Sequence, residues 1–383
     1  MTELMAARAA ARRGGRGRLL GIDAARALAL LGMMAVHILP SEAPDGSANW
    51  YYTIAGGRSS ALFAVLAGVG LALASGGSIV PSGTALKAAR RGTLARAGLL
   101  AAIGLILGGL DSGVAVILVH YGVLFVFGAL FLGMSRGWLW ALAGVWAVVA
   151  PVLSHMVRSA FGDPGGLVPN LGDLARPGHL LVDLMLTGYY PVFTWVSYLL
   201  AGLAIGRSQL RSPRQARALL AGGAGVAIGA RAGSAFLLRE AGIGPLPVQF
   251  FGTTPTDSWS YLAVATPHSG STFDLLHTAG SAAAVVGLCL LLGAAASWSV
   301  AWLAGAGGMT LTLYTAHVMA LATRLGVDNR PRLFAIHAGA ALILAALWRL
   351  TVGRGPLETV AANFAAVARS TVPSLPERSD RLP

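Results

Sequence analysis

The sequence predicts an all-α membrane protein, a polytopic transmembrane helical bundle of about ten spans. Hydrophobic residues make up 55% of the 383 residues, charged residues only 11%, and the mean hydropathy is +0.68. Apolar stretches of about 20 residues recur along the chain, a length typical of helices that cross a bilayer. These observations exclude an ordinary water-soluble protein and make the lipid bilayer a partner of the chain.

Each predicted span is an apolar stretch between charged residues or Pro and Gly breaks. In chain order the ten spans are expected at residues 21–39, 58–75, 93–110, 114–132, 138–155, 184–206, 218–238, 275–295, 300–321 and 333–352. We therefore expect a basic N-terminal segment at 1–19, one transmembrane domain at 20–355, and a polar, partly disordered tail at 356–383.

The basic residues predict that both termini are cytoplasmic. With the N-terminus inside, most Arg and Lys residues outside the spans fall on the cytoplasmic side, as the positive-inside rule requires. The loop at 324–332 disagrees, because it is basic and falls outside. The same distribution accounts for the formal charge of +13, because arginines that flank the spans set the orientation of the protein and contact anionic lipid. No nucleic-acid partner is therefore expected. The first span is interpreted as a retained helix, because Asp23 and Arg26 interrupt any signal-peptide core.

Three ionisable residues of the first span, Asp23, Arg26 and His37, are the strongest functional signal. Residues three apart on a helix are neighbours, so Arg26 reaches Asp23. His37 lies about 20° from Arg26 in azimuth and roughly 16 Å further along the axis. Charged groups in a bilayer are costly and usually functional. The alternative is a buried Asp–Arg pair that joins helices, with an interfacial histidine.

Other chemistries find little support in the sequence. Cys289 is the only cysteine and lies in an apolar stretch, so a disulfide, a thiolate nucleophile or a metal cluster is not expected. No phosphate-binding loop and no metal-ligand motif is present. We expect no metal.

The stretch from Asp23 and Arg26 to His37 resembles the opening of membrane-integral acyltransferases, the heparan-alpha-glucosaminide N-acetyltransferase family and related bacterial ten-span proteins. Further resemblances follow in order along the chain: GGRSSALFAVLAGVGLAL (56–73), VHYGVLFV (119–126), TGYYPVFTWVSYLLAGLAIGR (187–207), GGMTLTLYTAHV (307–318) and GRGPLE (353–358). One departure is that the lysosomal members carry a histidine in the loop after the first span, whereas SEAPDGSANWYYTIAGG (41–57) has none.

The resemblance implies transfer of an acyl group, usually acetyl, from cytoplasmic acyl-CoA to a sugar or glycolipid on the far side of a bacterial cytoplasmic membrane. His37 would be the catalytic residue, as a base or as a transient nucleophile. Arg26, held by Asp23, would bind the donor, whose pantetheine arm is of about the length that separates Arg26 from His37.

Five further residues are candidates for acceptor binding: Arg58, His268, Tyr121, Tyr190 and His317. Each has a simpler explanation. Arg58 could be a flanking residue that reaches water, His268 a surface loop histidine, and the tyrosines interfacial anchors. His317 lies within a span, where its ring requires a polar partner.

Two other classes of function stay open, a transporter or flippase with a polar pathway and a structural subunit. A transporter would be expected to show paired repeats and interrupted helices, and the sequence gives no sign of either. A homodimer is also possible.

Overall fold

The computed structural model describes residues 19–161, 168–326 and 328–372. These residues form helices and connections, without a β-strand; one isolated bridge joins Glu42 and Ala48. Most of the predicted basic segment at 1–19 and the end of the predicted tail lie outside the described residues. The beginning of that tail forms a helix.

The helices occur in this order: α2 (Leu20–Ile38), α3 (Trp50–Ala55), α4 (Arg58–Ala74), α5 (Gly83–Gly108), α6 (Leu118–Phe131), α7 (Arg136–Arg158), η1 (Leu171–Ala175), α8 (Pro177–Val182), η2 (Asp183–Thr187), α9 (Val192–Gly206), α10 (Pro213–Glu240), η3 (Trp259–Ala263), α11 (Thr272–Ala295), α12 (Ser297–Gly307), α13 (Thr310–Ala322), α14 (Arg330–Thr351) and α15 (Pro356–Ser370). Every predicted span therefore coincides with helical structure.

Within the described ranges, seven helices are long and apolar enough to cross a membrane, or up to eight if one bent pair forms a single span. The helices α6 and α13 are apolar but shorter, at 14 and 13 residues. A multi-pass helical protein is thus confirmed. The count of ten spans and the orientation of the termini stay predictions.

Two spans that were expected to be continuous are interrupted, so the expectation of uninterrupted helices is wrong. The sixth predicted span bends by 56° between Pro177–Thr187 and Val192–Gly206. Pro191 lies at this break and lacks the amide hydrogen that a continuing helix needs. The ninth predicted span divides into α12 and α13 at Gly308 and Met309.

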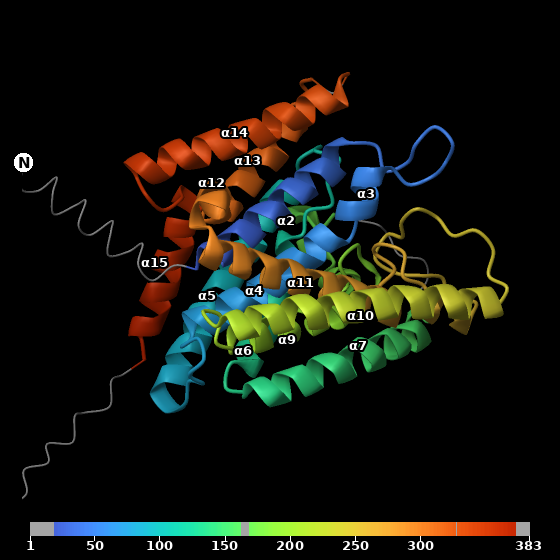
Figure 1. Cartoon of the computed structure of the whole chain (residues 1–383), viewed down its shortest axis with the longest axis horizontal. Helices are drawn as coiled ribbons and strands as arrows, with labels where there is room; N and C mark the ends of the chain where they lie inside the picture. The colour runs from blue at the N-terminus through green and yellow to red at the C-terminus, as the bar shows by residue number, and fades with distance from the viewer. Residues whose placement is uncertain (1–18, 162–167, 327, 373–383) are drawn as a thin grey trace, which may run out of the picture.

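Helices α2, α4, α9 and α11 form the centre of the bundle, and α7, α10 and α14 lie outside them (Figure 1). Small residues allow the central helices to approach closely. A Cβ atom at Gly202 of α9 would collide with the Val65 carbonyl oxygen of α4, and one at Gly307 of α12 would collide with the Asp23 carbonyl oxygen of α2.

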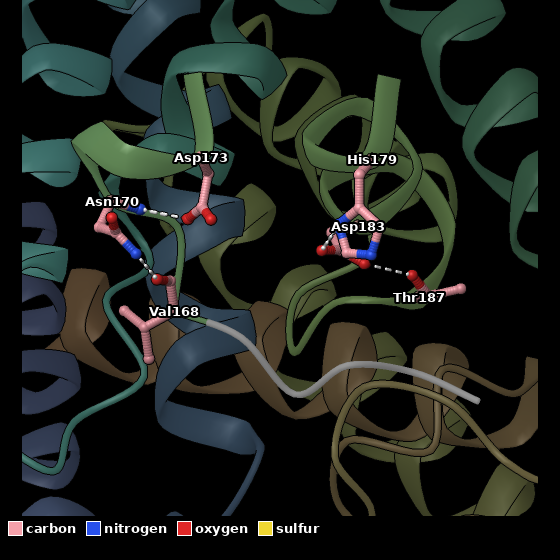
Figure 2. A network of polar contacts seen from close by, with 6 residues as sticks. All are labelled: Val168, Asn170, Asp173, His179, Asp183 and Thr187. Carbon is pink, nitrogen blue, oxygen red and sulfur yellow. Dashed lines mark hydrogen bonds and ion pairs between the residues drawn. The ribbon is translucent and has the colours of Figure 1, made fainter. Parts of the chain in front are cut away.

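The two ends of the bundle differ in structure. Helix α15 packs against α5 beside the N-terminal end of α2, whereas the long connections after α2 and after α10 lie at the opposite end (Figure 1). A polar network supports the connection before the bend (Figure 2). There Asn170 and Asp173 form a capping box around η1, and the Asp183 carboxylate contacts His179 at 3.1 Å and accepts from Thr187 at 2.8 Å.

Arg207 fixes the end of the bundle near α15. Its buried guanidinium donates to the carbonyl oxygens of Ala72, Gly77 and Leu132 at 2.8–3.1 Å, and to the Ser75 hydroxyl at 3.0 Å. Ala72 lies in the last turn of α4, Ser75 and Gly77 follow α4, and Leu132 follows α6, so the guanidinium joins the ends of two helices. A residue that contributed to the charge asymmetry of the sequence therefore also has a structural role.

Candidate active site

Three cavities follow one another along α2. The histidine cavity, about 990 Å³, lies beside the C-terminal end of α2 and is lined by His37 and His268. The middle cavity, about 460 Å³, is lined by Phe63, Tyr121 and Tyr314. The arginine cavity, about 610 Å³, lies at the N-terminal end of α2, and its charged lining residues are Asp23, Arg26, Arg96, Arg354 and Glu358.

The histidine cavity combines three of the predicted site residues, His37, Tyr190 and His268, from three distant parts of the chain. The Tyr190 hydroxyl donates to the Ala115 carbonyl oxygen at 3.1 Å, which fixes its ring in the wall. Further lining residues give the cavity a mixed aromatic and polar surface: Ser41, Glu42, Tyr52, Asp111, Tyr189, Gln249 and Phe251. Such a surface can stack on and hydrogen-bond to a polar organic molecule.

His268 is a buried loop residue, only 6% exposed, whose backbone has a positive φ of 59°. Its ring lies against Tyr189, with centroids 4.7 Å apart. Burial, with a smaller contribution from His37, lowers the pKa of His268 to about 4, because the charged imidazolium would lose its hydration. His268 is therefore neutral at pH 7, and it donates a hydrogen bond at one ring nitrogen and accepts one at the other.

His37 is the cavity residue with the most distinctive neighbours. Its Nδ1 lies 3.1 Å from Nε2 of His317, and Nδ1 of His317 lies 2.8 Å from Nδ1 of His337. The three rings come from α2, α13 and α14 and form one hydrogen-bonded row. Because Nδ1 of His37 is engaged with His317, Nε2 is the nitrogen left for a molecule in the cavity. His317 thus contacts His37.

The arginine cavity has an excess of positive charge. Arg26 contacts Asp23 at 3.3 Å. Arg96 lies within electrostatic range of Arg26, Arg354 and Arg369. The Glu358 carboxylate accepts from the amides of Leu311 and Thr312 at 2.7 and 3.1 Å, so it already satisfies the N-terminus of α13. Clustered guanidinium groups of this kind suit phosphate or another anion.

One stripe of α2 connects the cavities. Arg26 lines the arginine and middle cavities, Met33 lines the middle and histidine cavities, and His37 lines the histidine cavity. At 1.5 Å per residue, Met33 is about 10 Å from Arg26 and about 6 Å from His37 along the axis. The Met33 side chain therefore lies where the middle cavity meets the histidine cavity.

The two helix breaks line these cavities. Tyr189 and Tyr190 of the bend before α9 line the histidine cavity, and Gly308 of the break before α13 lines the middle and arginine cavities. Non-helical backbone at membrane depth is tolerated where it lines a cavity. The breaks therefore indicate that the cavities are built features of the bundle.

Two predicted acceptor residues lie elsewhere. Tyr121 lines the middle cavity, and its ring stacks on Phe63 with centroids 5.7 Å apart. The Arg58 guanidinium contacts Nε2 of His277 at 2.7 Å and the Thr53 carbonyl oxygen. The roles predicted for both residues stay predictions.

Sequence reasoning missed His337, Arg96, Arg354 and Glu358. His337 carried a usable signal, since a histidine within a predicted span needs a polar partner in the same way as His317. The charges at 96, 354 and 358 resembled ordinary flanking residues. In the part of the chain that the structure describes, no group of three His, Cys, Asp or Glu residues is arranged to hold a metal ion.

Comparison with known families gives one match. Residues 18–234, more than half of the chain, match the family model described as heparan-alpha-glucosaminide N-acetyltransferase, catalytic. The matched segment includes Asp23, Arg26, His37, Tyr121 and Tyr190. A search of curated proteins found no match.

Proposed function

Because the chain belongs to the heparan-alpha-glucosaminide N-acetyltransferase catalytic family, we propose that it transfers an acetyl group from cytoplasmic acetyl-CoA to a sugar or glycolipid on the far side of a bacterial cytoplasmic membrane. Membership in this family and the apolar helices support a membrane N-acetyltransferase. The identity of the acyl donor and of the acceptor, the side of the membrane from which each one binds, and the roles of individual residues are proposed here.

The arginine cavity is the proposed donor site. Coenzyme A carries phosphates, and the cluster of Arg26, Arg96 and Arg354 supplies charge-assisted donors for them. Asp23 would orient Arg26 through the 3.3 Å contact. From there the pantetheine arm would run through the middle cavity along the stripe of α2, bringing the thioester past Met33 to His37.

The histidine cavity is the proposed acceptor site. Sugars bind through stacking on aromatic rings and through hydrogen bonds from their hydroxyl groups. Tyr189, Tyr190 and Phe251 supply the rings, while Gln249 and neutral His268 supply hydrogen-bonding groups. The acceptor atom would be an amine or a hydroxyl of the sugar.

In the proposed reaction, Nε2 of His37 accepts the proton of the acceptor amine or hydroxyl. The acceptor atom bonds to the acetyl carbon, and the bond from that carbon to the CoA sulfur breaks. The leaving thiolate then takes the proton from the His37 imidazolium. Atoms and charges balance, since the proton moves from acceptor to thiol through the ring.

The observation that carries this proposal is the placement of Arg26, Met33 and His37 along one helix, with a cationic cavity at one end and a mixed aromatic and polar cavity at the other. A two-substrate enzyme of the membrane needs two sites that meet at the reacting atoms.

Purified wild-type protein and the H37A and R26A variants test the proposal with acetyl-CoA and methyl glucosaminide. We expect H37A to lose release of CoA thiol while acetyl-CoA still raises its melting temperature. R26A is expected to weaken that thermal shift. The exposed arginine variant R214A is the matched control, expected to behave as wild type. Full turnover by H37A would reject the proposal.

A transporter or flippase remains the second candidate, and the helix breaks at Gly308 and at the bend before α9 favour it more than the sequence did. The same preparation separates the two classes. A transporter would show no thermal shift with acetyl-CoA and would release no thiol.

A further inference from the structure

His37, His317 and His337 form the histidine row, and the hydrogen bonds between their rings determine which ring nitrogens carry protons. His317 is 3% exposed and uses both ring nitrogens, one toward His37 at 3.1 Å and one toward His337 at 2.8 Å. A neutral imidazole has one N–H donor and one bare acceptor nitrogen. One hydrogen bond of His317 must therefore be donated and the other accepted, which leaves two arrangements for the neutral row.

The two arrangements differ at the nitrogen that faces the histidine cavity. In the first, Nδ1–H of His37 donates to His317, and Nδ1–H of His317 donates to His337, which leaves Nε2 of His37 bare. In the second, both bonds run the other way, and Nε2 of His37 carries the proton. Only the first arrangement provides a base to the cavity.

The surrounding helices keep the row in register. Arg330, at the start of α14, donates to the Ile38 carbonyl oxygen at the end of α2 at 3.1 Å, so the helix that carries His337 is tied to the helix that carries His37. Tyr314 lies one turn before His317 on α13, and its ring is 6.4 Å from that of His37. The His37 and His317 rings are stacked, with an interplanar angle of 17°.

We propose that His317 and His337 are positioning residues, which hold His37 with Nδ1 protonated and Nε2 bare and share the positive charge when His37 accepts a proton. This inference rests on the proposed function, since it assigns partners to the proposed base. The proton enters at Nε2 of His37. As it does, the Nδ1 proton of His37 shifts toward His317, and the Nδ1 proton of His317 shifts toward His337. Both return when the thiolate is protonated.

Paired substitutions separate the hydrogen bond from packing. In H317Q, the amide oxygen can take the place of Nε2 and accept from His37, whereas H317L cannot accept. In H337N, the amide oxygen can take the place of Nδ1, whereas H337L cannot. Each variant is compared in kcat, in KM for acetyl-CoA, and in melting temperature with and without acetyl-CoA, with methyl glucosaminide as acceptor.

We expect H317L and H337L to lower kcat by about tenfold to hundredfold, by analogy with the loss seen when the hydrogen-bond partner of a metal-binding histidine is removed. KM for acetyl-CoA and its thermal shift should stay at wild-type values, because the arginine cavity is unchanged. H317Q and H337N should recover at least half of the lost activity on a logarithmic scale. This pattern would support the proposal.

Three results would overturn it. Wild-type kcat in both leucine variants, with H37A inactive, would reject the positioning role and leave the proposed function intact. Equal losses in the leucine and amide variants would indicate packing alone. Full activity of H37A would reject the proposed function itself, and the positioning role with it.

Discussion

Replacement of Arg207 by methionine should destabilise the bundle strongly. Methionine keeps much of the side-chain length but removes the guanidinium that donates to the carbonyl oxygens of Ala72, Gly77 and Leu132 and to the Ser75 hydroxyl. Ala72 and Leu132 are fully buried, so water has poor access to their carbonyl oxygens. The Leu132 carbonyl loses its guanidinium donor, whereas the Ala72 carbonyl still accepts from the Ser75 and Gly77 amides at 3.2 and 2.9 Å. The connection after α4 and the end of α6 would lose their common anchor.

The expected magnitude follows from the number of acceptors. Each buried acceptor that loses its partner costs about 1–3 kcal/mol, and water at the edge of the bundle can satisfy part of the set. The Leu132 carbonyl carries most of this cost, the Ala72 carbonyl keeps its two amide donors, and the Ser75 hydroxyl and the Gly77 carbonyl add a smaller share, so we expect a loss of about 2–4 kcal/mol.

Thermal unfolding of detergent-solubilised protein, followed by circular dichroism, measures this loss. R207M should lower the melting temperature by about 5–15 °C. The matched control R214M removes the same charge from an exposed position near the same end and should change it by less than about 2 °C. Equal melting temperatures for R207M and R214M would refute the argument, because they would show that the observed hydrogen bonds add nothing to stability.

Three further changes test separate parts of the structure. M33A should speed acetyl-CoA hydrolysis without acceptor, measured as thiol release, because Met33 lines both the middle and the histidine cavity and its truncation widens the contact through which water reaches the thioester. M33L, of similar volume, should not, and unchanged hydrolysis in M33A would show that the Met33 side chain does not limit this contact. E358A should lower the free energy of unfolding by about 1–2 kcal/mol, measured by thermal unfolding, because the first amides of α13 lose the carboxylate that caps them. The control E240A, at an exposed glutamate, should change this free energy little, and equal effects of the two variants would contradict the capping role of Glu358. The pKa of His268 is lowered to about 4 in the folded state, from about 6.5 when unfolded, so the unfolded state binds more protons between these two pH values. The free energy of unfolding should therefore fall by on the order of 3 kcal/mol as the pH drops from 6.5 toward 4. H268N should flatten that part of the pH–stability curve; parallel curves for wild type and H268N would show that His268 is not a buried neutral group.

The sequence was sufficient to predict helices at every span and the polar stripe on α2. Helix periodicity places Asp23, Arg26 and His37 on one face because it depends only on spacing within one segment. With the N-terminus inside, the predicted spans place His37, Tyr190 and His268 at the far-side ends of the first, sixth and eighth spans, and the structure brings them into one cavity. These features depend on local geometry or on membrane depth.

The remaining features of the site depend on which helices are neighbours. The spacing of residues within one helix carries no information about its neighbours. The partner of His317 could not be named from sequence, since His37 lies 280 residues away. The charge of Arg207 looked like a topology signal, and only the fold shows its carbonyl partners. The break at Gly308 was hidden because glycine is common in membrane helices for close packing as well.

The most direct test of the central claim, that the two cavities serve substrates from opposite sides, is transfer across a sealed membrane. Wild-type protein would be reconstituted in vesicles with radiolabelled acetyl-CoA on the side of the arginine cavity and methyl glucosaminide only on the other side. We predict labelled N-acetyl product on the acceptor side, and none with H37A. Product formed only when both substrates share one compartment would contradict the account.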